Sequence, residues 1–331
     1  MRALVRGDRG LALEEVATPR ALAADEVLLR VLVAGLCRTD RYVAEGRLGG
    51  AQGPRILGHE VAAEVVAVGE GAGGIACGAR VSVDPRIPCE GCEGCEGGRA
   101  CESPRFLGVD VDGGFAEYLR VPASAVVSVA NAAALDLRAL AYVEPIAASL
   151  AVFAAGIAPG ERGVVVGGGR IAALCLALLR QRGFTAVELW DPAADAGVDP
   201  TRRGGAFDFA IENGIDDDGL TRTLAALRRR GLLVVKSRRL APLSLDPGLL
   251  VRKELRVHAA YYGDFAEAAA LVADGALDLA PLWGPLRPLD DFAAAFAEAS
   301  RGEGRKQFFA IAAARAEAET GRCAGSSAPS A

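Results

Sequence analysis

Long hydrophobic runs are missing from this 331-residue sequence. A helix that crosses a bilayer needs roughly 20 apolar residues in a row, and no stretch offers them. Residues 1–14 mix charged and apolar side chains and lack the apolar segment of a signal peptide. Positive charge is not in excess either, because the formal net charge is -5, so the chain has no long-range attraction to phosphate backbones or anionic lipids. We expect a cytoplasmic protein that binds neither nucleic acid nor membrane and acts on a small soluble molecule.

Histidine is also scarce, since the sequence contains only His59 and His258. We expect His258, which lies close to Tyr261 and Tyr262 in the sequence, to be structural. Hydrophobic residues make up 51% of the chain and charged residues 24%, which is typical of a folded globular protein and excludes a fibrous or disordered one. The length allows two domains with their own cores.

The eight cysteines are unevenly distributed. Four of them, Cys89, Cys92, Cys95 and Cys101, fall within 13 residues and are separated by glycines, which let the backbone fold around one point. Four thiolates at this spacing are typical of a closed tetrahedral Zn²⁺ site. The alternative is a disulfide knot or a redox pair, but two bridges so close together would be strained. We therefore interpret this lobe as structural zinc.

Two short segments carry a second set of donors. Cys37-Arg38-Thr39-Asp40 and Gly58-His59-Glu60 bring a thiolate, an imidazole and carboxylates onto two turns. This mixed set is typical of a catalytic Zn²⁺ that keeps one position open. A histidine by itself is more often a structural residue than a ligand. The pairing of Gly-His-Glu with Cys37 favours the ligand interpretation.

A dinucleotide site is indicated in the second half of the chain. A short buried strand at 163–166 is followed by Gly167-Gly168-Gly169-Arg170-Ile171, which opens an apolar helix that extends to about residue 182. Such a turn lets a pyrophosphate approach free backbone N–H groups, and Gly167, Gly169, Arg170 and Ile171 are the candidate contacts. A second strand ends at Asp191, 22 residues after Gly169, where a carboxylate can bind a ribose hydroxyl.

Hydrophobic periodicity predicts the remaining elements. We expect strands near 3–5, 26–33, 61–68 and 80–83, with no further strand between residue 118 and the nucleotide domain. Helices are expected at 132–142, 147–156, 216–230, 266–274 and 292–301, and strands at 206–211, 231–235, 255–259 and 307–312. The helix at 216–230 would begin with three aspartates and end with Arg228-Arg229-Arg230, which suits the helix dipole. Residues 192–205 are short and polar where a doubly wound sheet would normally place another helix and strand.

In combination, these motifs resemble the zinc-dependent medium-chain alcohol and polyol dehydrogenases over about residues 1–313, with Val143-Glu144-Pro145 as a further anchor. The resemblance implies an α/β protein with a β-rich GroES-like catalytic domain and an inserted Rossmann-type doubly wound parallel sheet, here trimmed at 192–205. The expected boundaries are 1–148 and 264–314 for the catalytic domain with its zinc lobe at 88–103, 149–263 for the nucleotide domain, and 315–331 for a disordered tail.

The resemblance also implies roles for individual residues. Cys37 and His59 would be catalytic zinc ligands, and Glu60 and Glu144 would ligate or hold water. Asp40 would orient His59, and Thr39 would take the proton of the substrate hydroxyl. Arg38 and Lys306 resemble cationic positions that meet the cofactor pyrophosphate.

This sequence departs from the family pattern at three points. The last cysteine gap holds five residues, fewer than the family usually has, so the lobe must be tighter. Tyr42 stands where the alcohol dehydrogenase branch has a histidine that ends its proton relay. The shortened segment at 192–205 bears on the adenine side of the cofactor site.

We therefore predict an oxidoreductase that holds one catalytic and one structural Zn²⁺ and transfers a hydride between a secondary alcohol or polyol and NAD. NAD is expected over NADP because Asp191 would repel a 2′-phosphate. A homodimer or homotetramer is expected. The alternatives are a zinc-dependent ketone reductase of a biosynthetic pathway and a zinc-stabilised scaffold of the same fold without catalysis.

Overall fold

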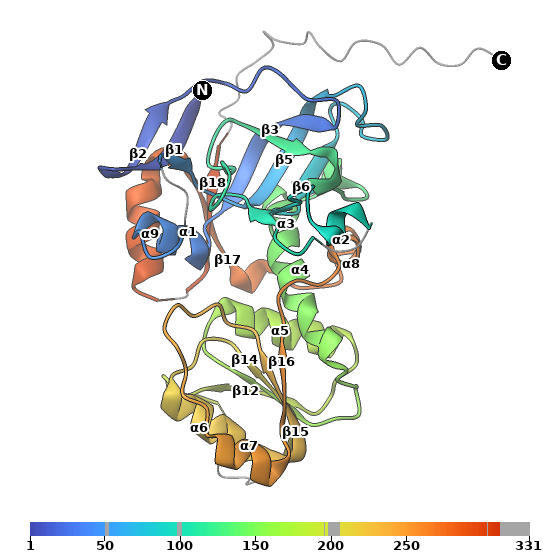
Figure 1. Ribbon diagram of the computed structural model, residues 1–331, viewed down its shortest axis with the longest axis vertical. Coiled ribbons are helices and arrows are strands. Elements are labelled where there is room, and N and C mark those ends of the chain that lie inside the picture. The colour runs from blue at the N-terminus through green and yellow to red at the C-terminus, as the bar shows by residue number, and fades with distance from the viewer. Residues whose placement is uncertain (50–52, 98–100, 195, 198–205, 303, 312–331) are drawn as a thin grey trace, which may run out of the picture. The chain divides into compact units, whose positions relative to one another are not determined.

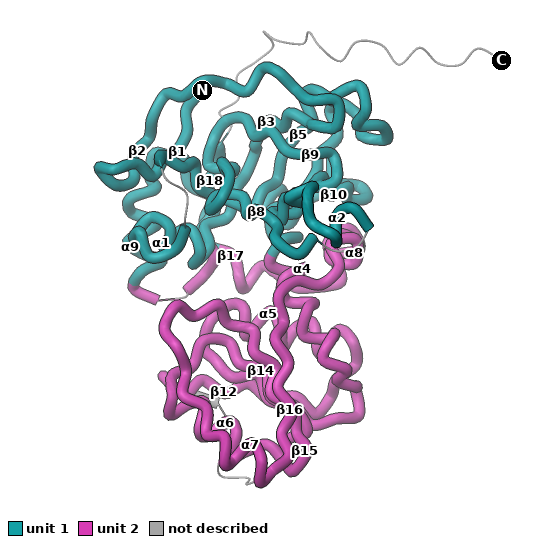
Figure 2. The backbone as a smooth tube through the Cα atoms, in the orientation of Figure 1, with its two compact units in different colours: residues 1–144, 284–300, 307–331 teal, residues 145–283, 301–306 magenta. Residues whose placement is uncertain are grey.

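The computed structural model describes residues 1–49, 53–97, 101–194, 196–197, 206–302 and 304–311. The chain divides into two compact units, which Figure 1 shows by element and Figure 2 by colour. Unit 1 comprises residues 1–144, 284–300 and 307–331, and unit 2 comprises residues 145–283 and 301–306. The chain passes from unit 1 to unit 2 within helix α4 (Val143–Leu150).

Unit 1 is built mainly from β-strands. Its strands are β1 (Arg2–Gly7), β2 (Gly10–Glu15), β3 (Glu26–Gly35), β4 (Arg55–Ile56), β5 (Glu60–Val68), β6 (Arg80–Val83), β7 (Arg86–Ile87), β8 (Arg105–Phe106), β9 (Tyr118–Pro122), β10 (Val126–Ser128), β17 (Trp283–Pro288) and β18 (Lys306–Ala310). The largest sheet has the order β10-β6-β5-β3-β18-β17, with β9 also paired to β3. Alternate residues of β3 are buried, as expected for a strand that covers a core with one face.

The helices of unit 1 are short. They are α1 (Arg38–Ala44), α2 (Glu93–Glu96), α3 (Leu137–Ala141) and α9 (Phe292–Ser300). The predicted helix at 132–142 is broken into a 3₁₀ turn, Ala132–Ala134, and α3, because Asp136 caps α3 by accepting the N–H of Arg138 over 2.8 Å. The expectation that strands stop at residue 118 was wrong, since β9 and β10 follow. Their alternating residues Leu119, Val121 and Val127 are buried in the core.

Unit 2 contains a six-stranded sheet in the order β13-β12-β11-β14-β15-β16. The strands are β11 (Gly163–Val166), β12 (Val187–Asp191), β13 (Ala196–Gly197), β14 (Phe207–Glu212), β15 (Leu227–Val235) and β16 (Arg256–Ala259). All neighbours are parallel except β13, which pairs with β12 in the antiparallel sense. The chain order of the strands reverses at β11, which makes this strand the topological switch point of the sheet.

Helices cover both faces of this sheet. They are α5 (Arg170–Gln181), α6 (Asp217–Ala226) and α7 (Pro247–Lys253), and the unit contains a further helix, α8 (Phe265–Ala273). Val165, Ile211 and Val234 pack in one core cluster with α5 residues. Val164 and Leu233, on the other face, pack with residues of α6. A sheet with an apolar core on each face is the doubly wound arrangement that the sequence predicted.

The predicted helix at 216–230 extends too far. Asp216 caps α6 as expected by accepting the N–H of Gly219 over 2.8 Å, but the helix ends at Ala226. Arg228, Arg229 and Arg230 belong to β15 instead. Arg228 pairs with Asp208, while Arg229 and Arg230 pair with Glu254. The arginine run is therefore held by carboxylates of unit 2 and does not cap a helix.

The segment 264–283 also differs from expectation, because it falls in unit 2 and not in the catalytic domain. Glu267 of α8 forms an ion pair with Arg182, which follows α5, and Tyr262 stacks on Phe265. The ion pair joins α8 to the end of α5 within unit 2. Most of the predicted trimmed segment, at 198–205, and the predicted tail at 315–331 lie outside the described residues.

Residues Leu137–Ala155 are long and apolar enough to cross a membrane by length and composition. However, 72% of this window is buried inside the fold. The stretch runs through α3 and α4, and the buried carboxylate of Glu144 lies within it. Its apolar character is accounted for by packing in the protein core.

Candidate functional site

Asp40 joins the two segments that carry the mixed donor set. The N–H of Cys37, which caps α1, donates to Oδ2 of Asp40 over 2.8 Å. The N–H of Gly58 donates to Oδ1 of the same carboxylate over 3.0 Å. Asp40 is 1% exposed, and a buried carboxylate is stable when backbone N–H groups satisfy it. The two turns are thus fixed relative to each other by one side chain.

Gly58 determines how the chain enters the site. Its φ of +95° lies in the region that favours glycine, and a Cβ at this position would lie 2.5 Å from the ring of Phe115. The turn delivers His59 and Glu60, which are 1% and 2% exposed, into the interior of unit 1. The ring of Phe106 packs edge-on against His59 with a centroid distance of 5.1 Å. The imidazole is therefore held by packing as well as by the turn.

The donor atoms of Cys37, His59 and Glu60 lie within 4.8 Å of one another. Nδ1 of His59 is 3.2 Å from Oδ1 of Asp40, yet among the described residues neither ring nitrogen has a hydrogen bond of acceptable geometry. A buried imidazole without such bonds is costly unless another group binds it. Burial disfavours the imidazolium, but the charges of Asp40 and Cys37 outweigh it and raise the pKa of His59 well above 6.5. The donor set and its electrostatics fit a divalent metal ion such as Zn²⁺.

Thr39, Glu144 and Tyr42 lie in the same unit. Thr39 is 9% exposed, and the thiol of Cys37 lies 3.8 Å from its hydroxyl oxygen. Glu144 is 4% exposed on the first turn of α4, but it is not part of the three-residue donor group. Tyr42 lies on α1, where the guanidinium of Arg47 covers its ring at 4.8 Å from the centroid. The structure thus brings together Cys37, His59 and Glu60 and leaves the metal contact of Glu144 as a prediction.

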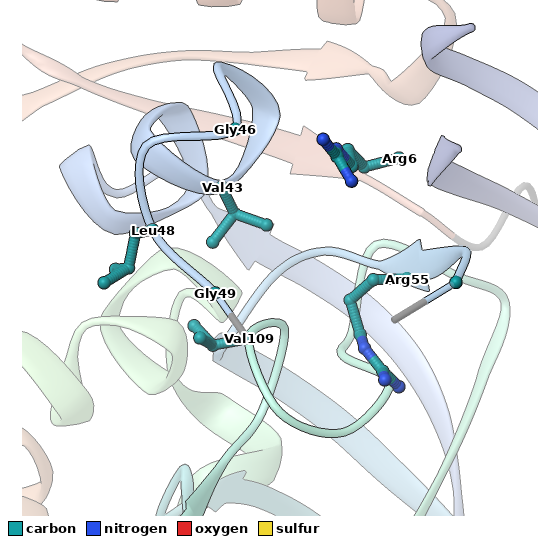
Figure 3. Close-up of a pocket in the computed structure, with 8 residues that line it drawn as sticks. Arg6, Val43, Gly46, Leu48, Gly49, Arg55 and Val109 are labelled. Carbon is teal, nitrogen blue, oxygen red and sulfur yellow. The ribbon is translucent and has the colours of Figure 1, made fainter. Parts of the chain in front are cut away.

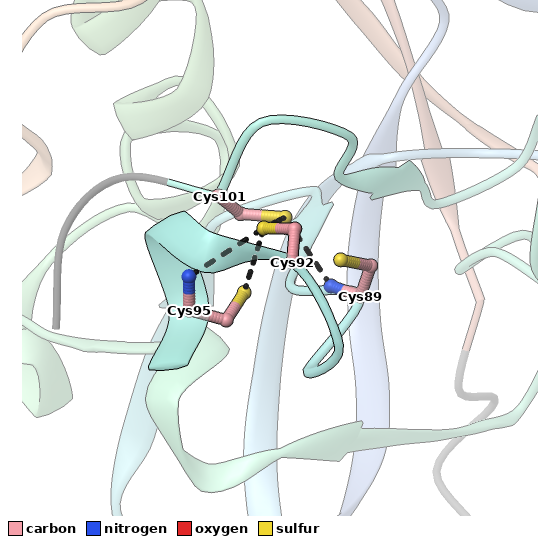
Figure 4. Close-up of side chains that lie close together, drawn as sticks. All are labelled: Cys89, Cys92, Cys95 and Cys101. Atoms are coloured by element: carbon pink, nitrogen blue, oxygen red, sulfur yellow. Dashed lines mark hydrogen bonds between the residues drawn. The ribbon is translucent and has the colours of Figure 1, made fainter. Parts of the chain in front are cut away.

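The second donor group is the cysteine lobe (Figure 4). The sulfur atoms of Cys89, Cys92, Cys95 and Cys101 all lie within 4.8 Å of one another. Cys92 Sγ is 3.6 Å from that of Cys95 and 3.9 Å from that of Cys101. Tetrahedral Zn²⁺ with bonds of about 2.3 Å requires sulfur separations of roughly 3.8 Å, so the four thiolates fit this ion. These four cysteines are free of disulfides.

Backbone N–H groups favour the thiolate form at two sulfur atoms of this lobe, those of Cys92 and Cys101. The amides of Glu102 and Cys95 point at the sulfur of Cys92 over 3.4 Å and 3.5 Å. Hydrogen bonds from Glu102 and Cys95 lower the pKa of Cys92 to about 6. The amide of Cys89 likewise donates to the sulfur of Cys101 over 3.3 Å and lowers the pKa of that thiol. Deprotonated sulfur is the form that binds a metal.

The glycine turn and Asp191 meet in unit 2. Gly167 follows β11 with a φ of +134°, and Gly169 caps the N-terminus of α5, which begins at Arg170 and Ile171. A Cβ on Gly168 would lie 1.8 Å from Oδ2 of Asp191, so a larger residue at this position would have to displace the carboxylate. The structure therefore joins the two halves of the predicted dinucleotide fingerprint. Arg38 is the first residue of α1 and Lys306 the first of β18, where Lys306 is 1% exposed.

A small cavity in unit 1 lies apart from these residues (Figure 3). Its volume is about 50 Å³, and its described walls are Arg6, Val43, Gly46, Leu48, Gly49, Gly53, Arg55 and Val109. A pocket for a small-molecule substrate typically measures about 300–1,000 Å³. This cavity is too small for a polyol and contains none of the predicted site residues.

Sequence reasoning missed Phe106 and the polar pair Asn213 and Lys236. Phe106 contacts His59 because β7 and β8, which lie on either side of the cysteine lobe in the sequence, pair with each other. No local sequence pattern indicates this contact. Asn213 and Lys236 are 8% and 7% exposed, directly after β14 and β15. Their polarity at the ends of two buried strands was the available signal.

The chain is similar to known proteins over both units. Residues 23–131 match the alcohol dehydrogenase GroES-like domain. L-galactonate-5-dehydrogenase of Escherichia coli K12 is 37% identical over 166 residues, which cover 49% of this chain and 48% of that protein. L-threonine 3-dehydrogenase of Pyrococcus horikoshii is 32% identical over 248 residues, or 72% of this chain and 69% of that protein. The chain thus spans about half the length of the first relative and two thirds of the second.

One solved structure matches this chain over almost its whole length. A protein of Sinorhizobium meliloti 1021, described as a zinc-binding dehydrogenase and bound to NADP, superimposes with a TM-score of 0.83 and 27% identity. The superposition covers 93% of this chain and 98% of that one. The likeness therefore extends through unit 1 and unit 2 alike.

Proposed function

The chain belongs to the zinc-dependent medium-chain dehydrogenase family, and we propose that it transfers a hydride between a secondary alcohol or polyol, or the corresponding ketone, and NAD(H). The observation that carries this proposal is the buried donor group of Cys37, His59 and Glu60, whose donor atoms lie within 4.8 Å of one another beside Asp40. A protein that needed only the structural zinc of the cysteine lobe would not require the donor group of Cys37, His59 and Glu60.

Each residue in and around the donor group would have its own role in binding metal. Cys37 and His59 would hold Zn²⁺, which supplies a Lewis acid for the substrate oxygen. Glu60 and Glu144 are buried carboxylates that would complete the ligand set or hold water. Asp40, at Nδ1 of His59, would fix the imidazole so that its other nitrogen faces the metal. The four cysteines of the lobe would hold a second, closed Zn²⁺.

Thr39 is the proposed proton acceptor for the substrate hydroxyl. Its side chain is 9% exposed and lies beside the Cys37 sulfur, so it would pass a proton on without exposing the site to bulk water. Tyr42 carries no imidazole, and its ring is covered by Arg47. The path from Thr39 would therefore lead through the cofactor ribose or water.

The nicotinamide cofactor, which accepts or donates the hydride, would bind at the carboxyl edge of the sheet in unit 2. The glycine turn and the N-terminus of α5 offer N–H groups to its pyrophosphate. Arg38 and Lys306 would add positive charge. Asp191 touches the glycine turn and would accept hydrogen bonds from the adenosine ribose, so we propose NAD over NADP.

Cofactor choice can be tested by titrating purified protein with NADH and NADPH and following fluorescence. Tighter binding of NADH, with the preference lost in Asp191→Ala, is the expected result. The similar Sinorhizobium meliloti structure holds NADP, so tighter binding of NADPH is a real alternative and would overturn the assignment of Asp191.

The proposed reaction can be tested with a panel of secondary alcohols, polyols and hydroxy acids in the presence of NAD⁺, and with the corresponding ketones and NADH. L-galactonate and L-threonine belong in the panel because relatives are named for them. We expect turnover of at least one substrate class by the wild type and none by Cys37→Ser. Binding of NADH without any turnover across the panel would favour the scaffold alternative.

A further inference from the structure

Arg6 and Arg55 lie directly opposite each other on two antiparallel strands of unit 1. Arg6 belongs to β1 and is in register with Arg55 of β4. The side chains of directly opposed residues project from the same side of a sheet. Like charges in such a pair are destabilising, and arginine cannot lose its proton to avoid the repulsion. Negative charge placed near the two guanidinium groups would therefore stabilise this pair of strands.

The carboxylate of Asp112 balances only one of these two positive charges. Nη1 of Arg55 donates to Oδ1 of Asp112 over 3.0 Å. Nε of Arg55 is buried and, among the described residues, has no hydrogen bond. The side chain of Arg6 takes part in no ion pair or hydrogen bond within the part of the chain that the structure describes. One positive charge of the pair is therefore left without a carboxylate partner.

Both arginines border the small cavity of unit 1. Figure 3 shows the Arg6 side chain extending toward the turn that carries Gly46. Gly46 leaves room for this guanidinium, because a Cβ at its position would lie 3.3 Å from Nη2 of Arg6. The other described walls are glycines and aliphatic side chains, so none of the described walls carries a carboxylate. The cavity thus presents positive charge that its own described walls do not neutralise.

The size of the cavity limits what can enter it. Its volume is about 50 Å³, and a single water requires about 10–15 Å³ of such space. The cavity therefore has room for roughly three to five atoms of that size, which suits a phosphate or sulfate ion. A sugar phosphate would have to leave its carbon chain outside. Guanidinium groups bind such oxyanions through charge-assisted hydrogen bonds.

We propose that Arg6 and Arg55 form a binding site for a free tetrahedral oxyanion such as inorganic phosphate. The guanidinium of Arg6 and Nε of Arg55 would donate to its oxygen atoms. The bound charge would relieve the repulsion between β1 and β4 and would hold the turn at Gly46 against β1. This turn follows the C-terminal end of α1, whereas Cys37 caps the other end of that helix. The oxyanion site is therefore distinct from the donor group of Cys37, His59 and Glu60.

The test titrates full-length, zinc-loaded protein with inorganic phosphate at constant ionic strength and follows binding by calorimetry. We expect half-saturation of the wild type at about 1 mM, and an affinity lower by about tenfold or more in Arg6→Gln, which removes the charge. Arg55→Gln should change the affinity in the same direction. Arg9→Gln is the matched control and should bind phosphate as the wild type does, since Arg9 is exposed in the turn between β1 and β2.

Thermal melts supply a readout that a purely structural role of Arg6 would not change. Without phosphate, Arg6→Gln should melt no lower than the wild type, because the substitution removes a pair of like charges. In saturating phosphate the wild type should melt at a higher temperature, since a ligand that binds only the folded state stabilises it. Arg6→Gln should lose this gain, whereas Arg9→Gln should retain it.

Equal phosphate affinity in the wild type and Arg6→Gln would overturn the proposal, because the ion would then bind elsewhere, at the glycine turn of unit 2 or at a metal. An Arg6→Gln protein that melts lower than the wild type by the same amount with and without phosphate would overturn it as well. Should Arg6→Gln fail to fold, Arg55→Gln carries the same comparison.

Glycerol 3-phosphate distinguishes the free ion from a phosphate ester. We expect it to bind more weakly than inorganic phosphate, because its carbon chain does not fit the cavity. Tighter binding of the ester, lost in Arg6→Gln, would contradict a site for the free ion. These outcomes are independent of the proposed dehydrogenase reaction, which the substrate panel tests separately.

Discussion

Oδ1 of Asp40 lies 3.2 Å from Nδ1 of His59, and both side chains are 1% exposed. The same carboxylate accepts N–H groups from Cys37 and Gly58. One buried acid therefore fixes the turn that presents the thiol and the turn that presents the imidazole. Strands β3 and β5 bring these turns side by side, since Gly35 pairs with Glu60, and the Asp40 carboxylate then ties them into one donor group.

Substitution of Asp40 should weaken metal binding more than it weakens the fold. Asp40→Asn keeps the shape of the side chain but removes the charge beside His59, and the zinc affinity should fall about 10–100-fold. Competition with a chelator measures the change. Asp112→Asn is the control, because that carboxylate pairs with Arg55 at the surface and should leave zinc affinity unchanged. An unchanged affinity in Asp40→Asn would show that Asp40 does not orient the ligand.

Substitutions of Thr39 and Tyr42 distinguish two possible paths for the substrate proton. Thr39→Ala should lower kcat about 100-fold or more, because general acid–base groups typically contribute at least this much. Tyr42→Phe should cost little, since its ring is covered by Arg47 and offers no imidazole. Steady-state kinetics on whichever substrate turns over decides. The opposite ranking of the two variants would place the relay at Tyr42.

The cysteine lobe should contribute to folding through its metal. Cys92→Ser removes one of four thiolates and should lower the melting temperature together with the zinc content, because a closed site releases its binding energy only in the folded state. Cys175→Ala is the control for zinc content, since this buried thiol belongs to α5 of unit 2 and is not one of the four thiols of the lobe. A Cys92→Ser protein that melts like the wild type and retains its zinc would contradict the structural assignment.

The ionisation of Asp208 makes the free energy of unfolding depend on pH. Partial burial opposes its ionisation, but the amide of Arg162 and the guanidinium of Arg228 outweigh this and hold the pKa of Asp208 below 3.8. A carboxyl whose pKa is lowered by folding stabilises the protein above its unfolded pKa, and this contribution is lost as the pH falls through the folded value. Asp208→Asn should therefore reduce the free energy of unfolding at pH 7 by up to about 1 kcal/mol, the limit for a partly exposed pair.

The effect of Asp208→Asn should disappear in acid. Denaturant unfolding at several pH values should show the two proteins converging below about pH 4. Asp218, which is 77% exposed in its pair with Arg222, supplies the control variant Asp218→Asn with a smaller effect. A difference that persists at low pH would mean that the substituted amide perturbs packing and not charge.

Much of the site could be predicted because its donors have a distinctive local spacing. Cys37 with His59, and the four cysteines from Cys89 to Cys101, lie on turns whose glycines and polar residues are visible in the sequence. The contacts that complete the site could not be predicted in this way. Phe106 meets His59 through the pairing of β7 with β8, which lie on either side of the cysteine lobe in the sequence.

The secondary structure was predicted correctly where a segment has one clear hydrophobic periodicity. β11 and α5 follow their apolar patterns closely, but the arginine run at 228–230 was assigned to a helix because three cations suit a helix C-terminus. In the structure, Leu227 pairs with Phe207 and starts a strand, and the arginines find their carboxylates in Asp208 and Glu254. Tertiary ion pairs outweighed the local preference there.

The central claim is that the chain holds an open metal site at Cys37 and His59 in addition to the closed one in the cysteine lobe. Elemental analysis of protein purified without chelator tests it most directly. The account predicts two zinc ions per wild-type chain, one for each donor group, and one per chain in a Cys37→Ser protein whose melting temperature is almost unchanged. One zinc ion per wild-type chain, retained in full by Cys37→Ser, would contradict it.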